Sequence, residues 1–344
     1  MDVLGERDPR YDLPLEDRWA AGVRAQEPRY SPAIKKGIAE TVALLGARWQ
    51  QAGVPPHVRA DYRVAVIVTR LLRGKGWRTW TDLAPHLRLL AEAEPAAFLE
   101  AIRSLSDDDV RALFRQEAEM GGAPHVHLLW ALEIFAWEPT YLARAALELG
   151  RLAQLDPGGR LSNRPADCLR EIFLPWIRHT RSDLVARLSA IDAILRERPD
   201  AGWRLLMDLT GRGADTSGGV QTPRFRDWAA GATRDVTIGE YHRCLRGIAR
   251  RALVAVGEDD KRWADLIANL PGLPEDLRDE AIGSLENVAH RLVASGGLDA
   301  WASLRRLLHH HRSFPESDWA WPAEVLDRLA AVYNLLAPPD LIER

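Results

Sequence analysis

Three stretches decide the fold of this chain: EPAAFL (residues 94–99), EPTYL (138–142) and RPDAGWRLL (198–206). In each stretch a charged residue precedes a proline, and an aromatic residue and a leucine follow. Proline fits the first turn of a helix, because the N–H that it lacks has no helical partner there. Each stretch follows an apolar segment with helical spacing, so we expect one helix to end and another to begin at each proline. The prediction is a series of helical hairpins.

The rest of the chain favours the same fold class. It has 344 residues, of which 47% are hydrophobic and 28% charged, enough for a sizeable core. The segment VAVIVT (64–69) is rich in β-branched residues and could form a buried strand. We predict a helix there, because no turn signal interrupts the segment and no second strand pattern lies nearby. The uneven spacing of the prolines favours an all-α, irregular array of helical hairpins, a degenerate α-solenoid like HEAT or TPR arrays.

Composition and spacing divide the chain into four regions. We expect an extended lead-in over 1–30 with one short helix near 18–24, and a helical-repeat region over 31–210. A loop rich in Gly, Ser and Thr should follow over 211–235, and a C-terminal helical region over 236–344 should pack on the array. The segment GRGADTSGGVQTPR (211–224) has no apolar period, so we expect it to be long and exposed. Later helices are predicted over 238–256, 259–269, 275–295, 298–311 and 322–337.

Several local signals predict particular caps and partners. Ser106 and the three following aspartates are typical of a helix start, and that helix should end near Met120, before Gly121 and Gly122. Residues 180–183 (TRSD) fit a capping box for a helix over 181–198, after a helix over 166–178. The segment VHLLWALEIFAW (126–137) is apolar nearly all round and should form a central helix. We expect Glu133 within it to pair with an arginine from a neighbouring helix.

Thirteen tryptophans are spread along the chain. Tryptophans that are spread along the sequence indicate packing between successive helices, whereas clustered tryptophans would indicate a binding cage. The close pairs Trp77/Trp80 and Trp319/Trp321 are the exceptions, since paired aromatics also anchor interfaces.

Charge and cysteine content exclude some classes of protein. The net charge is −3, so the chain lacks the basic excess that is typical of nucleic-acid binders. Nucleic-acid binding through a local arginine stripe remains an alternative. Two cysteines, Cys168 and Cys244, give no disulfide framework and no four-ligand zinc site. The charged start of the sequence does not resemble a signal peptide, and no apolar run is long enough to span a membrane. We therefore expect a cytoplasmic protein with no membrane partner.

No motif in the sequence predicts catalysis. The Gly-rich segment 211–219 has no lysine and cannot be a Walker A loop. Asp107–Asp109 lack the spacing of a magnesium-binding DDxxD motif and fit a helix cap. His309–His311 are consecutive, so their side chains point about 100° apart on a helix and cannot converge on one ion. Cys168 is expected to be a buried, inert thiol. We therefore predict no catalytic residue, no metal and no cofactor.

Two surfaces are candidates for binding, because aromatic side chains interleaved with arginines are typical of protein interfaces and of phosphate contacts at helix ends. The alternative for both is that the same side chains anchor their own loops through internal hydrogen bonds. The first surface comprises Arg160, Asn163, Arg164, Trp176, Arg178 and His179, and the second comprises Arg224, Phe225, Arg226, Asp227 and Trp228.

Much of the chain resembles a known kind of protein region. Residues 128–180 and 198–209, with LEDRWAAG (15–22) and the hairpin 77–102, are similar to a helical region of large bacterial STAND-type NTPases and related defence proteins. Those proteins combine an effector, an NTPase and a helical-repeat sensor. The resemblance covers roughly residues 10–230 and implies the sensor. This chain departs from the family plan, because it has neither the NTPase nor an effector, and that departure puts ATPase or nuclease activity in doubt.

These observations favour a non-enzymatic scaffold or sensor that recognises a protein partner, in antiphage defence or regulation. One alternative is an all-α enzyme whose site is assembled from distant residues such as Glu133, His179 and Asp227. A second alternative is nucleic-acid binding through an arginine stripe.

Overall fold

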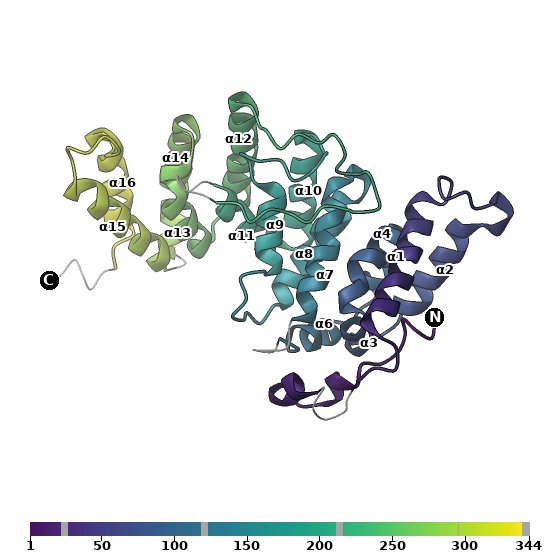
Figure 1. The fold of residues 1–344 in the computed structure, drawn as a ribbon. Coiled ribbons are helices and arrows are strands. Elements are labelled where there is room, and N and C mark those ends of the chain that lie inside the picture. Colours follow the sequence, from purple (N-terminus) through teal and green to yellow (C-terminus); the bar gives the residue numbers. More distant parts are fainter. Residues whose placement is uncertain (22–26, 118–122, 211–215, 295, 339–344) are drawn as a thin grey trace. The chain divides into compact units, whose positions relative to one another are not determined.

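The computed structural model is all-helical, and it contains no strand in residues 1–21, 27–117, 123–210, 216–294 and 296–338, the residues that the structure describes (Figure 1). The chain forms two compact units. Unit 1 comprises Met1–Ala201 and Gly218–Asp235, and unit 2 comprises Gly202–Ser217 and Val236–Arg344. The predicted loop region 211–235 is thus divided between the units. None of the helices in the described ranges has the length and hydropathy that crossing a bilayer requires.

Unit 1 is built from short helices that follow one another closely. Its α-helices are α1 (Pro32–Arg48), α2 (Ala60–Leu72), α3 (Trp77–Asp82), α4 (Leu87–Ala93), α5 (Pro95–Arg103), α6 (Asp107–Phe114), α7 (Pro124–Glu133), α8 (Pro139–Leu155), α9 (Pro165–Phe173) and α10 (Leu184–Glu197). Short 3-10 helices are η1 (Pro9–Asp12), η2 (Leu15–Ala20), η3 (Pro56–Val58), η4 (Ala84–His86) and η5 (Ile134–Trp137). The helix α11 (Pro199–Leu209) leads from unit 1 into unit 2.

The three proline joints are confirmed as helix starts. Pro95, Pro139 and Pro199 are the first residues of α5, α8 and α11. The side chain of Glu138, directly before the second proline, accepts a hydrogen bond from the N–H of Thr140.

Two further local predictions are confirmed. Ser106 caps α6, since its side chain accepts the N–H of Asp109. The segment 64–69 lies in α2, so the helix is right and the strand alternative is wrong.

Packing between these helices creates the core of unit 1. The helix α4 packs against α1 and α7, and α8 packs against α9 and α10. The fully buried rings of Trp80, Phe98 and Phe135 form a chain within this core, with centroids 5.7 and 5.9 Å apart. Gly46 of α1 makes the contact with α4 close, because a Cβ there would lie 2.1 Å from the backbone oxygen of Ala93.

Three local predictions need correction. The helix after Ser106 ends at Phe114 rather than near Met120, which lies outside the described residues. The helix α9 ends at Phe173 rather than at residue 178, because Pro175 forces Leu174 into an extended conformation. No capping box forms over 180–183: Asp183 caps α10 through the N–H of Ala186, while the hydroxyl of Thr180 accepts the N–H of Ser182.

Unit 2 follows the predicted helix boundaries within about two residues. Its helices are α12 (Ile238–Ala255), α13 (Asp260–Asn269), η6 (Leu270–Gly272), α14 (Glu275–Ala294), α15 (Leu298–Ser313) and α16 (Ala323–Leu335). The helix α13 packs against α15, and α14 packs against α12 and α16. The tryptophan pair of this unit stacks on the end of α15, with Trp319 on His310 and Trp321 on His311, each at 4.4 Å between centroids.

Candidate functional site

Residues 218–235, which we call the strap, return to unit 1 without forming a helix. We predicted an exposed loop over 211–224, and for the described residues this is wrong in part. Val220 is only 6% exposed, and Trp228 further along the strap is 8% exposed. Residues 211–215 lie outside the described part. The sequence of the strap has no apolar period. The strap is held because side chains elsewhere in unit 1 accept hydrogen bonds from its backbone N–H groups.

Glu92 of α4 is the main attachment point of the strap. It is 1% exposed, and its Oε2 accepts the backbone N–H groups of three consecutive strap residues. The donor–acceptor distances are 2.9 Å for Arg224, 2.5 Å for Phe225 and 3.2 Å for Arg226. Hydrogen bonds to a carboxylate are stronger than those to a neutral acceptor. Glu92 therefore fixes the backbone of the strap whatever side chains the strap carries.

The side chain of Arg226 strengthens this attachment. Its guanidinium donates to the backbone oxygens of Gly46 (3.2 Å), Glu92 (2.7 Å) and Ala93 (3.1 Å), at the C-terminal ends of α1 and α4. A cation is favourable there, because helix C-termini present unpaired carbonyl groups.

Trp228 supplies the apolar part of the attachment. The centroid of its ring lies 6.1 Å from that of Phe135 and 5.6 Å from that of Tyr141. The strap is therefore joined to the aromatic core of unit 1 as well as to its helix ends.

Glu133 binds the strap instead of an arginine, so the predicted ion pair is wrong. Its carboxylate accepts the N–H of Gln221 at 3.0 Å and the thiol of Cys168 at 3.0 Å. Trp137 donates its ring N–H to the backbone oxygen of Gln221 at 2.9 Å. Burial raises the pKa of Glu133 above its ordinary value, an effect that these hydrogen bonds only partly offset.

Cys168 is a hydrogen-bond donor rather than a nucleophile in this arrangement. Burial, and then the neighbouring Glu133 carboxylate, raise the pKa of its thiol well above the usual range. A reactive cysteine needs an electropositive, accessible environment that favours the thiolate. The described surroundings of Cys168 are instead buried and carry a negative charge, which agrees with the buried, inert thiol that we expected from the sequence.

The three residues suggested for an enzyme site have different surroundings. His179 is fully buried, and its Nδ1 lies 2.7 Å from the backbone oxygen of Glu171. Burial lowers the pKa of His179, so the ring is neutral at physiological pH. Asp227 is an exposed strap residue. Within the described residues, no hydrogen bond or ion pair joins Asp227 to Glu133 or His179.

The first predicted binding surface is used largely for loop anchoring. Arg164 forms ion pairs with Asp156 and, at 2.9 Å, with Glu117. The backbone N–H of Arg160 donates to Glu117 at 3.0 Å. These contacts hold the loop over residues 156–164 against unit 1.

Of the remaining members of the first surface, Asn163 and Arg178 also have internal contacts. Asn163 accepts the thiol of Cys168 at 3.3 Å. The backbone N–H of Arg178 donates to the strap oxygen of Arg234 at 3.0 Å. Trp176 is half-buried, and its ring N–H has no hydrogen-bond partner among the described residues. The structure thus favours anchoring over a continuous binding surface here.

The second predicted surface lies in the strap itself. Arg226 and Trp228 face unit 1, so they anchor the strap. Arg224 forms an ion pair with Glu40 of α1 and remains largely exposed. Of this surface, Arg224 and Asp227 are therefore the charged groups that stay accessible to solvent.

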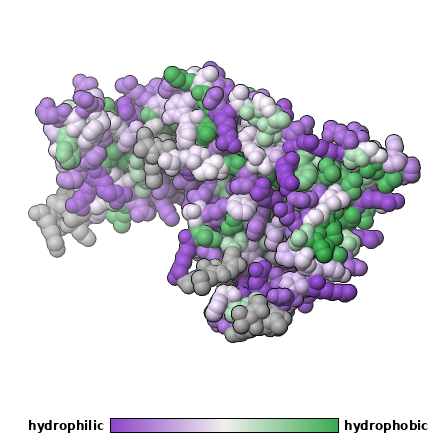
Figure 2. Space-filling view, viewed as in Figure 1, coloured by the Kyte–Doolittle hydropathy of each residue, from purple (hydrophilic) through white to green (hydrophobic). Residues whose placement is uncertain are grey.

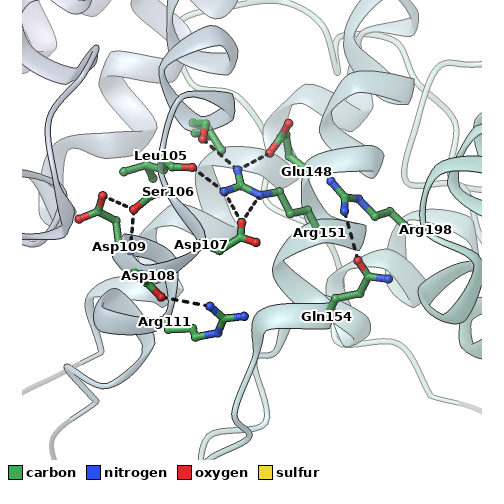
Figure 3. Close-up of polar contacts among 11 residues, drawn as sticks. Leu105, Ser106, Asp107, Asp108, Asp109, Arg111, Glu148, Arg151, Gln154 and Arg198 are labelled. Atoms are coloured by element: carbon green, nitrogen blue, oxygen red, sulfur yellow. Dashed lines mark hydrogen bonds and ion pairs between the residues drawn. The ribbon is translucent and has the colours of Figure 1, made fainter.

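An arginine-lined groove, which the sequence analysis missed, lies on α5, α8 and α10 of unit 1. Figure 3 shows Arg151 at the centre of a polar network, where it contacts Asp107 at 2.9 Å, Glu148 at 3.5 Å and the backbone oxygen of Leu105. The available signal was that Arg144 and Arg151 are two helical turns apart, on one face of α8. The groove encloses about 380 Å³, and its walls carry Leu99, Arg103, Arg144, Leu147, Glu148, Arg151, Glu197 and Arg198.

The groove combines fixed and unpaired cations. Arg151 is held rigidly, whereas Arg103 and Arg144 make no hydrogen bond or ion pair to any residue in the described ranges. Burial raises the pKa of Glu148, and Arg151, Arg103 and Arg198 oppose that shift. The groove therefore presents more positive than negative charge beside two leucines.

A second exposed surface of unit 1 is apolar. Figure 2 shows hydrophobic residues gathered where Figure 1 places α1 and α2. Large apolar or aromatic side chains that are exposed on these helices include Ile34 (52%) and Leu44 (40%) on α1 and Tyr62 (59%) on α2. Exposed apolar patches are typical of contact surfaces.

The described side chains bring together no set of three or more His, Cys, Asp or Glu residues that could hold a metal ion. Comparisons of the whole chain with protein-family models, with curated proteins and with solved structures give no match.

Proposed function

We propose that the chain is a non-enzymatic recognition module whose arginine-lined groove binds an acidic segment of a protein partner. The groove carries the proposal, because it offers unpaired arginines beside leucine side chains. Arginine suits interfaces, since its planar guanidinium binds carboxylates with two parallel hydrogen bonds. A segment that alternates acidic and apolar side chains would complement both features.

Rigidity of the groove supports a binding role. Arg151 is fixed by two carboxylates and by the backbone oxygens of Ile102 and Leu105. A preorganised surface loses less conformational entropy when a partner binds. Arg103 and Arg144 flank this fixed centre from separate helices, so both can reach one extended segment.

The buried titratable groups support binding rather than catalysis. Glu92 and Glu133 hold the strap, Cys168 donates to Glu133, and His179 is buried against Glu171. An enzyme site needs such groups to converge on a cavity that a substrate can enter. The arginine-lined groove is lined by none of Glu92, Glu133, Cys168 and His179. Glu92 lines a second cavity of unit 1, but its carboxylate is already occupied there by the strap N–H groups.

The resemblance to sensor regions of STAND-type defence proteins fits this proposal. We propose that the hairpins of unit 1 form an irregular array of the HEAT or TPR type, and that the chain acts as a sensor or scaffold in bacterial defence or regulation. In such an array, successive hairpins build a continuous surface for a partner.

The test is fluorescence polarisation with a labelled peptide of alternating glutamate and leucine, and with its lysine-for-glutamate counterpart. We expect the acidic peptide to bind and the basic peptide not to bind. Arg144→Glu should weaken binding about tenfold, equivalent to about 1.4 kcal/mol. The matched control is Arg204→Glu on α11, which makes the same charge change at a side chain that is 66% exposed and outside the groove.

Equal effects of Arg144→Glu and Arg204→Glu would overturn the proposal, as would equal binding of both peptides. Labelled duplex DNA tests the nucleic-acid alternative in the same assay. DNA binding that falls steeply with salt and is lost in Arg144→Glu, without peptide binding, would replace protein recognition by nucleic-acid binding.

A further inference from the structure

A second cavity, separate from the arginine-lined groove, lies between α1, the η4–α4 segment and the strap. It encloses about 370 Å³, within the range of small-molecule pockets. Pro32 comes from α1, Pro85 and Leu89 from the η4–α4 segment, and Arg224 from the strap. The surface that the cavity exposes is mostly apolar. Its size and lining therefore suit a small molecule with an apolar body.

The charged groups around this cavity are not balanced. Both carboxylates are occupied, since Glu40 pairs with Arg224 and Glu92 accepts three strap amides. Lys36 and Arg88 also line the cavity. Neither forms a hydrogen bond or an ion pair with any residue in the described parts of the chain, and the Nε atom of Arg88 is buried without a partner. The unsatisfied charge at the cavity is therefore positive.

A buried histidine adds a neutral polar group to the same wall. His86 is 7% exposed, and its Nδ1 atom has no hydrogen-bond partner among the described residues. Burial, with Lys35 and His127 nearby, lowers the pKa of His86 to about 4. The ring is thus uncharged at neutral pH and can donate or accept one hydrogen bond. An unsatisfied buried polar atom is costly, and a ligand with a polar end could remove that cost.

We propose that this cavity binds a small organic carboxylate, with its apolar chain against Pro32, Pro85 and Leu89. The carboxylate group pairs with Arg88 and Lys36. A neutral ligand of the same shape would leave Arg88 unpaired, and a cationic ligand would meet like charges. The preference for an anion is therefore the distinguishing property of the site.

The position of the cavity couples the ligand to the strap. Arg224 lines the cavity and, through its backbone N–H, is bound to Glu92. A ligand that contacts Arg224 stabilises the bound conformation of the strap by mass action. Hydrogen exchange of strap amides in residues 218–235 should therefore slow when the ligand is added.

The experiment is isothermal titration calorimetry of the full chain with octanoate, 1-octanol and octylammonium. These probes share an apolar chain and differ in the charge of the head group. We expect octanoate to bind at least about tenfold more tightly than 1-octanol, and octylammonium to bind most weakly. Arg88→Gln should reduce the affinity for octanoate to that for 1-octanol.

Two further variants locate the binding site. Arg103→Gln removes an unpaired arginine of the groove and should leave octanoate binding unchanged. Leu89→Trp fills the cavity and should abolish binding of octanoate, with folding verified by circular dichroism. Any of three results would overturn the proposal. These are equal affinities for octanoate and 1-octanol, equal effects of Arg88→Gln and Arg103→Gln on octanoate binding, and undiminished octanoate binding by Leu89→Trp. Because Arg88 lies outside the groove, Arg88→Gln leaves the acidic-peptide assay as an independent test of the proposed function.

Discussion

The strap and the loop over residues 156–164 are both irregular segments of unit 1, yet unit 1 holds them in different ways. In the loop, Arg164 bridges Asp156 and Glu117, and Glu117 accepts the N–H groups of Arg160 and Leu161 at 3.0 and 3.3 Å. In the strap, Glu92 and Glu133 accept backbone N–H groups, and neither carboxylate forms an ion pair with an arginine of the described residues.

Burial explains the difference and its consequences. The side chain of Glu117 is 18% exposed, whereas Glu92 is 1% exposed as a residue. A partly exposed ion pair can exchange its contacts for water at little cost, but a buried carboxylate depends on every hydrogen bond that it receives. The strap should therefore be much more sensitive to loss of one side chain than the loop.

The largest effect is expected for Glu92→Ala. It leaves three strap N–H groups without their acceptor, and we expect a loss of about 3–5 kcal/mol in the free energy of unfolding. Chemical denaturation measures that loss, and trypsin cleavage after Arg224 and Arg226 should accelerate. Glu100→Ala on the exposed face of α5 is the control and should change stability by less than about 0.5 kcal/mol. Equal stability of the two variants would contradict the role of Glu92.

Trp228→Ala tests the apolar half of the strap attachment. Its ring packs on Phe135 and Tyr141, so we expect a loss of about 3 kcal/mol, confined largely to the strap. Hydrogen exchange by mass spectrometry should show faster exchange over 218–235 and little change over 156–164. Trp19→Ala, at a 66% exposed position, serves as control. Faster exchange over both segments would indicate that the strap and the loop are one cooperative element.

Arg164→Ala should have a smaller effect, of about 1–2 kcal/mol, because its two carboxylate partners can reach water. Exchange should accelerate over 156–164 and stay unchanged in the strap. A loss as large as that of Glu92→Ala would remove the contrast between the two segments.

Glu133→Gln should show the smallest effect, and the size of that effect should depend on pH. Burial raises the folded-state pKa of Glu133 above its ordinary value of 4.5, so the folded chain holds this proton to higher pH than the unfolded chain does. Ionisation therefore costs stability as the pH rises through that interval. Glutamine keeps an acceptor for the N–H of Gln221 and never ionises.

Thermal unfolding from about pH 4 to about pH 7 measures this difference. The stability of Glu133→Gln relative to the unchanged protein should increase with pH. A relative stability that falls as the pH rises would show that ionised Glu133 stabilises the folded state.

Local chemistry explains which predictions succeeded. The proline joints, the Ser106 cap and the helix boundaries of unit 2 depend on residues within one or two turns, so the sequence carries the whole signal. The two errors over 166–183, an overlong helix and an expected capping box, also have local causes. Pro175 ends α9 early, and Asp183 caps α10 through its own side chain. The binding surfaces were harder to predict, because an arginine that anchors a loop and one that awaits a partner have the same sequence signature.

By itself, the sequence determined an all-helical chain and most of the points at which its helices begin, because capping and proline geometry act within a few residues. Only the tertiary structure decided where the strap lies, which carboxylates receive it, and which arginines and lysines stay unpaired. The contact between Glu92 and Arg224 joins residues 132 positions apart. Such pairings depend on which helix faces meet and on how completely they exclude water, and no local pattern encodes either quantity.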